Sequence, residues 1–532
     1  MRLLKKYLFL DASIRTSNDS RNYHIMSDKR IQSALISVFY KEGLADIVKF
    51  LYELGVKIYS TGGTFSYLND LNIPSEKVED LTSYPSILGG RVKTLHPSVF
   101  GGILARRGNV EDLEQLSKFK IPQIDLVIVD LYPFEETLRS SLSEEEIIEK
   151  IDIGGISLIR AAAKNYNDVL VVSDKEQYAD ILSLLNEKKG HTSVSDRRLY
   201  AAMAFKTSSH YDTAIFNYFN RETSIPAFRE SINSSYPLRY GENPHQKGIF
   251  YGDSSLIFEK LHGKEISYNN LLDLDAALNL IDEFRKPTYV IIKHNNACGV
   301  ASRESTLAAW NDALACDPVS AYGGVIVTNT LVDEGVAAEI DKIFFEIIIA
   351  PQFTESALSV LTQKKNRIIL LRKASERSKY SFRSILNGVL WQERDNATES
   401  SEQMRTVTIR TPTKAEFEDL IFANIIVKHS KSNAIVVAKN SQLCASGIGQ
   451  TSRVDALKQA IEKALSFGFE LNGSVMASDA FFPFADSVEI AHKAGITAII
   501  QPGGSVRDQE SVDYCSSNGI AMVFTGIRHF KH

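Results

Sequence analysis

One short run of the sequence concentrates residue types that suit a bound phosphate. Residues 89–97 read GGRVKTLHP, and a second glycine pair follows at 101–102. Glycine lets the backbone approach a ligand closely and adopt positive φ. Arg, Lys and Thr side chains donate hydrogen bonds to phosphate and to polar heterocycles. An ordinary surface loop whose charges face water is an equal alternative on composition alone. Two further polar, glycine-rich stretches in the same half of the chain favour a ligand site.

The first of these stretches is Thr61-Gly62-Gly63-Thr64, which follows an expected strand at 56–59 and leads into an expected helix. This arrangement directs free backbone N–H groups and a helix N-terminus at an anion. A plain tight turn is about as compatible with the same four residues. The position at the carboxyl end of a strand favours the binding interpretation, because open α/β sheets bind ligands there.

The second stretch, residues 151–155, enters a helix that carries Arg160 and Lys164 four residues apart on one face. Asp152 could serve a ligand, or it could simply cap that helix. A continuous helix from Gly154 would place Lys164 about 15 Å further along. Asp152 and Lys164 could then share a ligand only if the ligand were extended or the helix broke.

Polar residues also follow expected strands in the second half of the chain. Residues 238–246 (LRYGENPHQ) are dense in groups that recognise ligands rather than pack. The strand expected at 289–292 ends in Lys293 and His294, with two Asn after them. A histidine at a strand end is more often structural, but beside a lysine its pKa suits proton transfer. The loop at 478–486 interleaves carboxylates with aromatic rings, which suits a flat heterocycle with polar edges as well as a core.

The elements that must position these residues alternate between strand and helix, which predicts an α/β fold with a doubly wound first domain. An apolar run that continues without interruption is typical of a parallel central strand. The expected strands of the first half lie at 31–39, 56–59, 124–131 and 169–173, with a helix at 44–54. Later, blocks 289–328 and 434–504 share a loose plan, so an internal duplication is possible.

Length and composition restrict the class of protein. A chain of 532 residues implies three or four folding units. A net charge of −5 argues against broad binding of nucleic acid or membranes, and no apolar run is long enough to span a bilayer. The four cysteines are far apart with no CxxC pair, which fits a reducing cytoplasm and predicts neither a zinc knuckle nor disulfides. We expect residues 1–29 to be a disordered extension and residues 30–225 and 226–532 to be two domains.

Six specific runs occur together: GGRVKTLHP, DIGG…RAAAKN, RYGENPHQ, KHNNACG, SDAFFPF and IRHFKH. From about Ile31 to His532 the chain closely resembles the purine-biosynthesis enzymes that combine phosphoribosylaminoimidazolecarboxamide (AICAR) formyltransferase with IMP cyclohydrolase. The resemblance implies formyl transfer from 10-formyltetrahydrofolate to the 5-amino group of AICAR. Closure of formyl-AICAR to IMP with loss of water would follow. It also implies a homodimer.

For residues 30–225 the resemblance implies a methylglyoxal-synthase-like domain that closes the ring. Lys93, Tyr132, Asp152 and Lys164 would take part in catalysis, with Lys164 the favoured proton donor or acceptor. The nucleotide would be held by Lys41, Thr61, Gly62, Gly63, Thr64, Arg91, Thr94, Asp130 and Ile153. The sequence departs from the family pattern at two places: Phe39-Tyr40 stands where Ser-Asp is common, and Asp130 stands where Asn is usual.

For residues 226–532 the resemblance implies a formyltransferase built as two cytidine-deaminase-like subdomains. The HxE and PCxxC signatures of zinc deaminases are absent, so no catalytic metal is expected. His294 would accept a proton and Lys293 would steady the formyl oxygen. The ribotide would be bound by Arg239, Tyr240, Gly323, Glu346, Asn433, Arg453 and Arg528. Phe481, Asp486 and Ser505 would shape the amide and folate pocket.

Two alternatives to the two-step enzyme stay open at this point. The first domain alone resembles a lyase of the methylglyoxal-synthase type, although the basic run and the second domain speak against it. A module that binds purine nucleotides without turnover is the other alternative, and the intact Lys93, Lys164, Lys293 and His294 argue against it.

Overall fold

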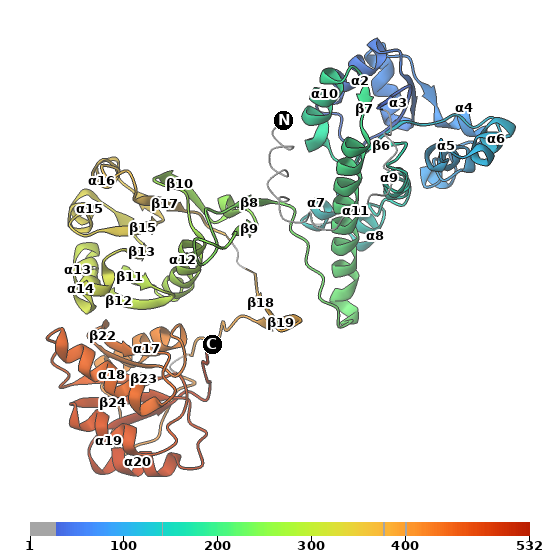
Figure 1. Ribbon diagram of the computed structural model, residues 1–532. Coiled ribbons are helices and arrows are strands. Elements are labelled where there is room, and N and C mark those ends of the chain that lie inside the picture. The colour runs from blue at the N-terminus through green and yellow to red at the C-terminus, as the bar shows by residue number, and fades with distance from the viewer. Residues whose placement is uncertain (1–27, 141, 376–377, 400–401) are drawn as a thin grey trace, which may run out of the picture. The chain divides into compact units, whose positions relative to one another are not determined.

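The computed structural model describes residues 28–140, 142–375, 378–399 and 402–532, and the chain divides into two compact units (Figure 1). Unit 1 is Met1–Ile232 and unit 2 is Asn233–His532. The division lies between helix α11 (Val194–Thr223) and strand β8 (Ser235–Pro237), in the same stretch as the expected domain boundary at 225–226. Most of the expected N-terminal extension, residues 1–27, lies outside the described residues.

Unit 1 is built on a five-stranded parallel sheet in the order β4-β3-β2-β5-β6. The first long strand lies in the middle, and the chain extends the sheet on one side before it returns to the other. These strands are β2 (Ser33–Ser37), β3 (Lys57–Ser60), β4 (Glu76–Lys77), β5 (Leu126–Val129) and β6 (Leu170–Val172). The doubly wound prediction is therefore confirmed, and its switch point lies between β2 and β5.

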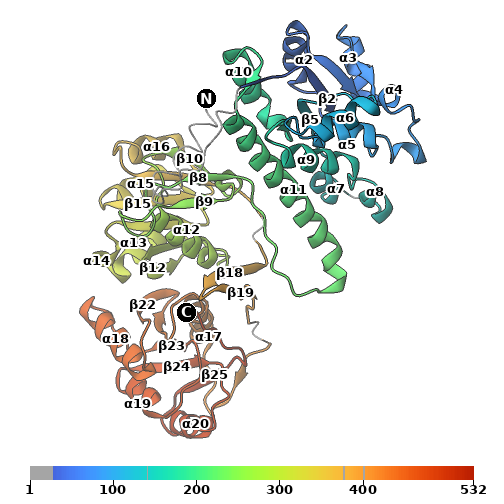
Figure 2. The ribbon, with the colours of Figure 1, turned by 45° about the vertical axis from the view of Figure 1, so that its right-hand side comes forward.

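Helices cover both faces of this sheet because its strands are apolar on both sides. One apolar cluster includes residues of α2 (Leu44–Glu53) and α10 (Tyr178–Glu187). The other includes residues of α5 (Pro97–Leu104), α9 (Gly154–Lys164) and α11, and α9 lies beside α11 (Figure 2). The remaining elements in the described part of unit 1 are β1 (Lys29–Arg30), α3 (Gly62–Asp70), α4 (Val78–Thr82), the 3-10 helix η2 (Leu88–Gly90), α6 (Val110–Lys118), α7 (Phe134–Leu138), α8 (Glu144–Ile148), the 3-10 helix η3 (Lys175–Gln177) and β7 (His191–Thr192).

Unit 2 contains a twelve-stranded mixed sheet whose order is symmetric about its middle: β10-β17-β15-β13-β11-β12, then β22-β21-β23-β24-β25-β20. The first half consists of β10 (Phe258–His262), β11 (Thr288–Lys293), β12 (Asn296–Ser302), β13 (Gly324–Thr328), β15 (Phe345–Ala350) and β17 (Ile368–Arg372). The second consists of β20 (Arg405–Thr406), β21 (Ile435–Lys439), β22 (Gln442–Gly447), β23 (Ser474–Ser478), β24 (Ile496–Gln501) and β25 (Ala521–Phe524). Each half has one antiparallel hairpin followed by parallel strands, so the suspected duplication is present as a repeat of topology.

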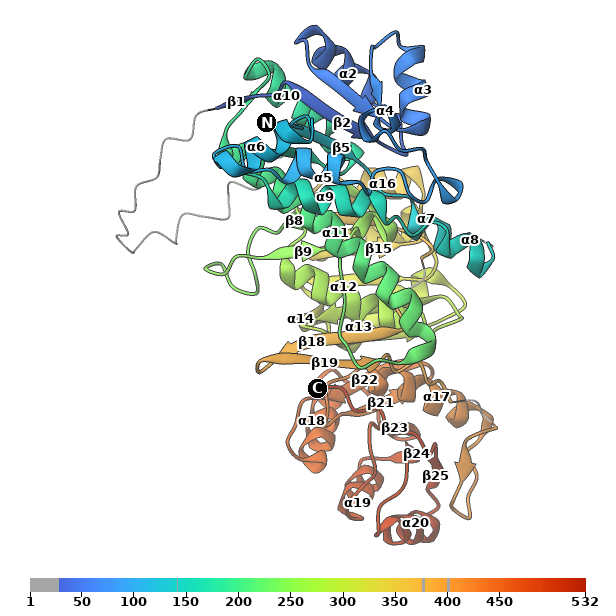
Figure 3. The ribbon, with the colours of Figure 1, turned by 90° about the vertical axis from the view of Figure 1, so that its right-hand side faces the viewer.

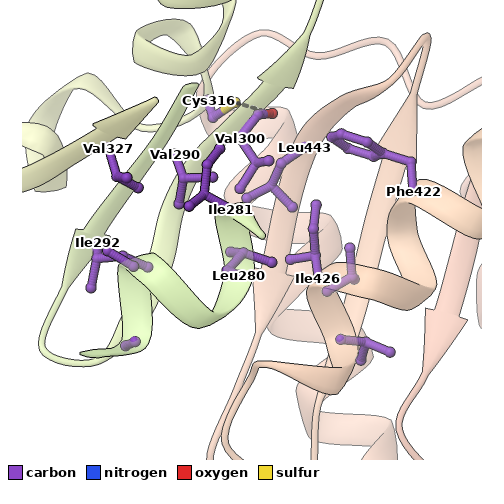
Figure 4. Close-up of a cluster of buried hydrophobic side chains, with 14 of the residues drawn as sticks. Leu280, Ile281, Val290, Ile292, Val300, Cys316, Val327, Phe422, Ile426 and Leu443 are labelled. Carbon is purple, nitrogen blue, oxygen red and sulfur yellow. Dashed lines mark hydrogen bonds between the residues drawn. The ribbon is translucent and has the colours of Figure 1, made fainter. Parts of the chain in front are cut away.

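The helices of unit 2 repeat in the same way. α12 (Tyr268–Ile281) and α17 (Lys414–Lys428) share one apolar cluster on one face of the sheet. Figure 4 shows Leu280 and Ile281 of α12 and Ile426 and Phe422 of α17 beside strand residues of both repeats. The other face carries a separate cluster in each repeat. One includes α13 (Thr306–Cys316), α15 (Glu334–Asp341) and α16 (Glu355–Leu361), and the other includes α18 (Arg453–Ser466), α19 (Asp486–Lys493) and α20 (Asp508–Ser517).

Short elements complete unit 2. β8 pairs with β9 (Ile249–Tyr251), β14 (Leu331–Val332) pairs with β16 (Gln352–Phe353), and α14 (Pro318–Ala321) precedes β13. β18 (Tyr380–Ile385) and β19 (Gly388–Glu393) form a separate two-stranded hairpin (Figure 3).

Gly447 in β22 offers a test of the packing between sheet and helix. A Cβ at this residue would lie 1.8 Å from the carbonyl oxygen of Ala456 in α18, so the strand and helix meet only if residue 447 has no side chain. Gly447→Ala should lower the free energy of unfolding by about 1–3 kcal/mol, measured by urea denaturation. Gly388→Ala is the matched control because no atom lies within 4 Å of its Cβ position. Equal midpoints for both variants would contradict this packing.

Candidate active sites

The first candidate site lies in unit 1 at the carboxyl ends of β2, β3 and β5, the place where the sheet order reverses. The loops after β2 and β3 are joined by side-chain hydrogen bonds. Ser37 Oγ lies 2.7 Å from Thr61 Oγ1, and the hydroxyl of Thr64 lies 3.0 Å from both the backbone N and O of Val38. Thr61 and Thr64 are therefore buried and shape the loop, while Gly62 and Gly63 between them are exposed.

Asp130 after β5 holds the loop after β2. Its carboxylate accepts the backbone N–H groups of Phe39 and, at 2.9 Å, of Tyr40. Burial raises the pKa of Asp130, while these N–H groups and the charge of Lys41 oppose the rise. The Phe39 ring also contacts Tyr132 edge to face, at 5.7 Å between centroids. Phe39-Tyr40 and Asp130, the two departures from the family pattern, are therefore in contact. The Asp130 carboxylate is occupied by hydrogen bonds from the loop after β2.

The glycine-rich run supplies the next side chains of this cluster. A Cβ at Gly62 would lie 3.8 Å from Lys93 Nζ, and a Cβ at Gly154 would lie 3.1 Å from Thr94 Oγ1. Lys93 and Thr94 therefore reach the N-termini of α3 and α9 respectively. Arg91 is directed elsewhere and forms an ion pair with Glu149.

Asp152 does cap α9, since its Oδ1 accepts the N–H of Gly155 at 2.6 Å. Burial raises the pKa of Asp152, and the N–H groups of Gly155, Gly154 and Tyr132 oppose that rise. Burial followed by the charge of Asp152 raises the pKa of Tyr132. The phenol and the carboxylate therefore influence one another, so Asp152 can be both a cap and part of the site.

Lys164 and Ile153 lie apart from these contacts. Helix α9 is unbroken from Gly154 to Lys164, so the two ends are about 15 Å apart. Lys164 lines a different cavity of 550 Å³, together with aromatic rings such as Phe100 and Phe205. Ile153 is 58% exposed. The structure does not bring Lys164 to Asp152.

The second candidate site lies in unit 2 at the hairpin between β11 and β12. Lys293, the last residue of β11, donates from Nζ to the carbonyl of Tyr322 at 2.7 Å. A Cβ at Gly323 would lie 3.1 Å from this Nζ. Gly323 also has a φ of 71°, which favours glycine. Both this backbone conformation and the closeness of the Lys293 ammonium therefore disfavour a side chain at residue 323. His294 follows in the turn and is exposed.

Asn296 connects this hairpin to the second repeat. Its Nδ2 donates to the carbonyl of His294 at 2.9 Å, and its Oδ1 accepts the N–H of Lys431 at 3.3 Å. Two residues further along the chain, the Oδ1 of Asn433 accepts a hydrogen bond from Arg453 at 3.0 Å. Side chains from both repeats therefore form one cluster.

The guanidinium of Arg453 is largely buried and is held by hydrogen bonds and an ion pair. Besides Asn433 it donates to Ser478 Oγ at 3.0 Å and forms an ion pair with Asp479. Asp479 is 1% exposed, and its carbonyl accepts the N–H of His529 at 3.0 Å. Arg453 therefore joins the loop after β23 to the last residues of the chain.

Residues 527–532 enter the cluster through two further contacts. Ser432 N–H donates to the carbonyl of Lys531 at 2.9 Å, and Ser432 Oγ accepts the N–H of Lys531 at 3.0 Å. These bonds place the segment that carries Arg528 beside Asn433. A cavity of 640 Å³ adjoins the segment, and its lining includes Arg383, Lys531 and His532.

His529 is a charged group that the sequence reasoning missed, although the run IRHFKH contained it. The imidazole is 2% exposed and lies between Asp395 Oδ2, at 2.6 Å, and Glu399 Oε1, at 2.8 Å. Burial alone would lower the pKa of His529, but the two carboxylates outweigh it and raise the pKa to about 9. The protonated imidazole therefore ties residues 527–532 to the segment after β19.

The remaining predicted residues of unit 2 make local contacts. Glu346 pairs with Lys264 at 2.6 Å, and Arg239 lies over the Tyr240 ring at 5.3 Å. Phe481 is 38% exposed in the loop after β23, and Asp486 begins α19. Ser505 Oγ accepts the N–H of Arg507 at 3.1 Å. None of these contacts involves Lys293 or His294.

In residues 28–140, 142–375, 378–399 and 402–532, no group of three or more His, Cys, Asp or Glu side chains could hold a metal ion. Within the same ranges no helix is long and apolar enough to cross a membrane.

Two α/β units, each with cations and hydrogen-bonding groups gathered at strand ends, define a fused protein with two separate candidate sites. Comparison with known proteins agrees. The family model "AICARFT/IMPCHase bienzyme" matches residues 162–463, and the model "MGS-like domain" matches residues 43–157. The chain therefore belongs to the AICARFT/IMPCHase bienzyme family.

Curated relatives support this assignment over almost the whole chain, and each of the following is described as a "Bifunctional purine biosynthesis protein PurH". The relative from Bacteroides thetaiotaomicron is 63% identical over 95% of this chain and 99% of its own. That from Acetivibrio thermocellus is 48% identical over 94% and 100%. That from Aquifex aeolicus is 47% identical, again over 94% and 100%.

The buried charge of His529 predicts a pH dependence of stability. Its pKa is higher in the folded protein than in the unfolded chain, where it is about 6.5. The interaction is therefore complete below about pH 6.5 and is lost as the pH rises through about 9. The free energy of unfolding of unit 2 should fall between these values in the parent protein. In His529→Gln, urea titrations should give a shallower fall with pH. Parallel pH profiles for the two proteins would contradict the stabilising role of the ion pairs between His529 and the carboxylates of Asp395 and Glu399.

Proposed function

We propose that the two activities named by the family are divided between the units: unit 2 transfers the formyl group and unit 1 closes the ring. The chain carries out the last two steps of IMP biosynthesis, formylation of AICAR and cyclisation of formyl-AICAR. The observation that carries the division is that each unit has its own cluster of cations and proton-handling groups. The match of the MGS-like model to residues 43–157, within unit 1, supports ring closure there.

In unit 2 the 5-amino group of AICAR would attack the formyl carbon of 10-formyltetrahydrofolate. This amine is a weak nucleophile, so positioning and a nearby base are what the protein must supply. His294 would accept the amine proton, and Lys293 would stabilise the negative charge that develops on the formyl oxygen. Collapse of the intermediate then breaks the bond to N10 of the folate, which takes up a proton.

The same site would hold the ribotide through groups from both repeats. Gly323 leaves space beside the Lys293 ammonium, while Asn433 and Arg453 come from the second repeat. The other groups that we assign to AICAR and folate are Arg239, Tyr240, Glu346, Phe481, Asp486, Ser505 and Arg528. Among these, Arg528 lies in the segment that His529 holds in place.

In unit 1 the carboxamide nitrogen of formyl-AICAR would attack its own formyl carbon, and water would then leave. An oxyanion forms during the attack and needs a nearby cation or hydrogen-bond donor. Lys93 and Tyr132 would supply these at the strand ends, and Asp152 would handle a proton. The phosphate and polar edges would be held by Lys41, Gly62, Gly63, Arg91, Thr94 and Ile153, while Thr61, Thr64 and Asp130 would hold the loops that form the binding site. Lys164, at the far end of α9, would be the proton donor or acceptor for a ligand that extends along this helix.

We also propose a cytoplasmic homodimer. The hairpin β18–β19 exposes large apolar side chains, among them Tyr380 (44%), Leu390 (51%), Trp391 (51%) and Leu386 (100%). An isolated two-stranded hairpin is marginally stable in water, so a second copy of the chain is its proposed cover. The four cysteines are buried and free, which suits a reducing compartment.

Separate variants test the division of labour. His294→Ala should abolish formyl transfer, followed spectrophotometrically with AICAR and 10-formyltetrahydrofolate, and should spare closure of supplied formyl-AICAR. Lys93→Ala should slow closure about 10²-fold or more and spare transfer, because removal of one group that stabilises an oxyanion costs that much. Lys164→Ala should also slow closure and spare transfer, and closure at the parent rate would contradict a proton-transfer role for Lys164.

The outcomes of this assay separate the alternatives. Loss of both activities from either single variant in folded protein would contradict the two-site assignment. Turnover of neither substrate by the parent protein would favour a binding module, and phosphate release from dihydroxyacetone phosphate would favour a lyase.

The dimer has its own test. Leu390→Asp should shift the protein from dimer to monomer in analytical ultracentrifugation, because a carboxylate cannot be buried unpaired in an apolar interface. Leu465→Asp on α18 is the control, since Leu465 is 58% exposed on another part of unit 2. A monomeric parent protein, or a Leu390→Asp protein that remains dimeric, would contradict the proposed contact.

A further inference from the structure

The residue that we propose as the proton acceptor lies in a turn with an unusual backbone. Lys293 at the end of β11 pairs with Asn296 at the start of β12, so His294 and Asn295 alone form the connection. Both have positive φ, 50° and 64°. A two-residue hairpin with both residues left-handed matches the right-handed twist of the strands. Asn and His adopt this conformation more readily than most residues, but it costs free energy for any side chain and persists where the surrounding structure restrains it.

That restraint comes from Asp273 on helix α12. Its Oδ1 accepts the N–H of Asn295 at 2.7 Å. Burial raises the pKa of Asp273, while the backbone N–H groups of Asn295 and His294 and the charges of His294 and Lys293 oppose the rise. The Asp273 carboxylate therefore faces the turn from helix α12 and contacts its backbone N–H groups.

Asp273 is itself on a rigid support. Helix α12 starts with a reciprocal capping box between Ser267 and Asn270, three residues before Asp273. Leu274, the next residue, is 2% exposed in the apolar cluster that α12 shares with α17. The helix that carries the Asp273 carboxylate is therefore fixed both at its start and by its buried face.

The second repeat contains the same contact between a helix aspartate and a hairpin turn. Asp419 on α17 accepts the N–H groups of Asn440 and Ser441 at 2.7 and 2.6 Å. These two residues form the turn between β21 and β22, and their φ values are 54° and 51°. Neither side chain is a base for proton transfer at neutral pH. An aspartate that accepts N–H groups of the hairpin turn is therefore common to both repeats. Of the two turns, the one in the first repeat contains a histidine.

We propose that Asp273 is a positioning residue for formyl transfer, which fixes His294 toward the reacting amine by holding the His294–Asn295 turn from α12. This inference rests on the proposed role of His294. Asn296 and Lys293 restrain the same turn from other sides, through the carbonyls of His294 and Tyr322. Asp273 is the side chain that accepts the N–H of Asn295 in the turn.

The test uses the full-length protein and the matched aspartate of the other repeat. Asp273→Ala should lower kcat for formyl transfer about 10²-fold, because a misplacement of about 1 Å costs that much. The KM for AICAR should change less than about threefold, and ring closure in unit 1 should be unaffected. Asp419→Ala removes the same kind of contact, so it should lower the urea midpoint of unit 2 similarly while formyl transfer falls less than about threefold.

Two further variants separate positioning from simple loss of structure. Asp273→Asn keeps one acceptor for the turn and should retain several times more transfer activity than Asp273→Ala. If Asp273→Ala does not fold, Asp273→Asn is compared with Asp419→Asn, and a loss confined to Asp273→Asn is the expected result.

The outcomes distinguish this inference from the function on which it rests. If His294→Ala transfers formyl groups at the parent rate, the assignment of His294 is wrong. If His294→Ala is inactive but Asp273 and Asp419 variants lose transfer equally, the positioning role of Asp273 is wrong and its carboxylate is only a hairpin support.

Discussion

Unit 2 depends on one shared apolar layer. The central strands β12 and β22 meet at Ala301 and Gln442, and the two repeats continue each other there. Beneath them, α12 and α17 bury Leu280, Ile281, Phe422 and Ile426 in a single cluster. Each such side chain contributes roughly 1.5–3 kcal/mol when it is removed from water. The contact between Asn296 and Lys431, which unites the candidate transferase residues, can persist only while this layer holds the repeats together.

Much of the fold could be predicted from hydrophobic pattern. The continuous apolar run at 124–131 marks the parallel strand that became β5, and Gly55 marks the end of α2 with its φ of 75°. Polar loops at strand ends pointed to the switch point between β2 and β5, because a parallel sheet collects the carboxyl ends of its strands on one edge. The loose likeness of blocks 289–328 and 434–504 reflects the symmetric strand order.

The missed features involve pairs distant in sequence. Nothing near His529 shows that Asp395 and Glu399 will enclose it, since more than a hundred residues separate them. Asp273 similarly resembles any acidic residue on a helix until the hairpin folds over it. Asp130 illustrates the reverse case. Asp130, which stands where Asn is usual, is explained by the hydrogen bonds that its carboxylate accepts from the N–H groups of Phe39 and Tyr40.

The symmetric sheet has an evolutionary consequence. A duplicated segment begins with two equivalent hairpins, each supported by its own carboxylate, and the mechanical requirement on both is the same. One tip, Asn440-Ser441, carries residues that suit the bend alone, while the other, His294-Asn295, carries an ionisable ring. Because the support lies in the helix and not in the tip side chains, a repeat of this kind can change a tip residue without giving up the carboxylate that holds the bend.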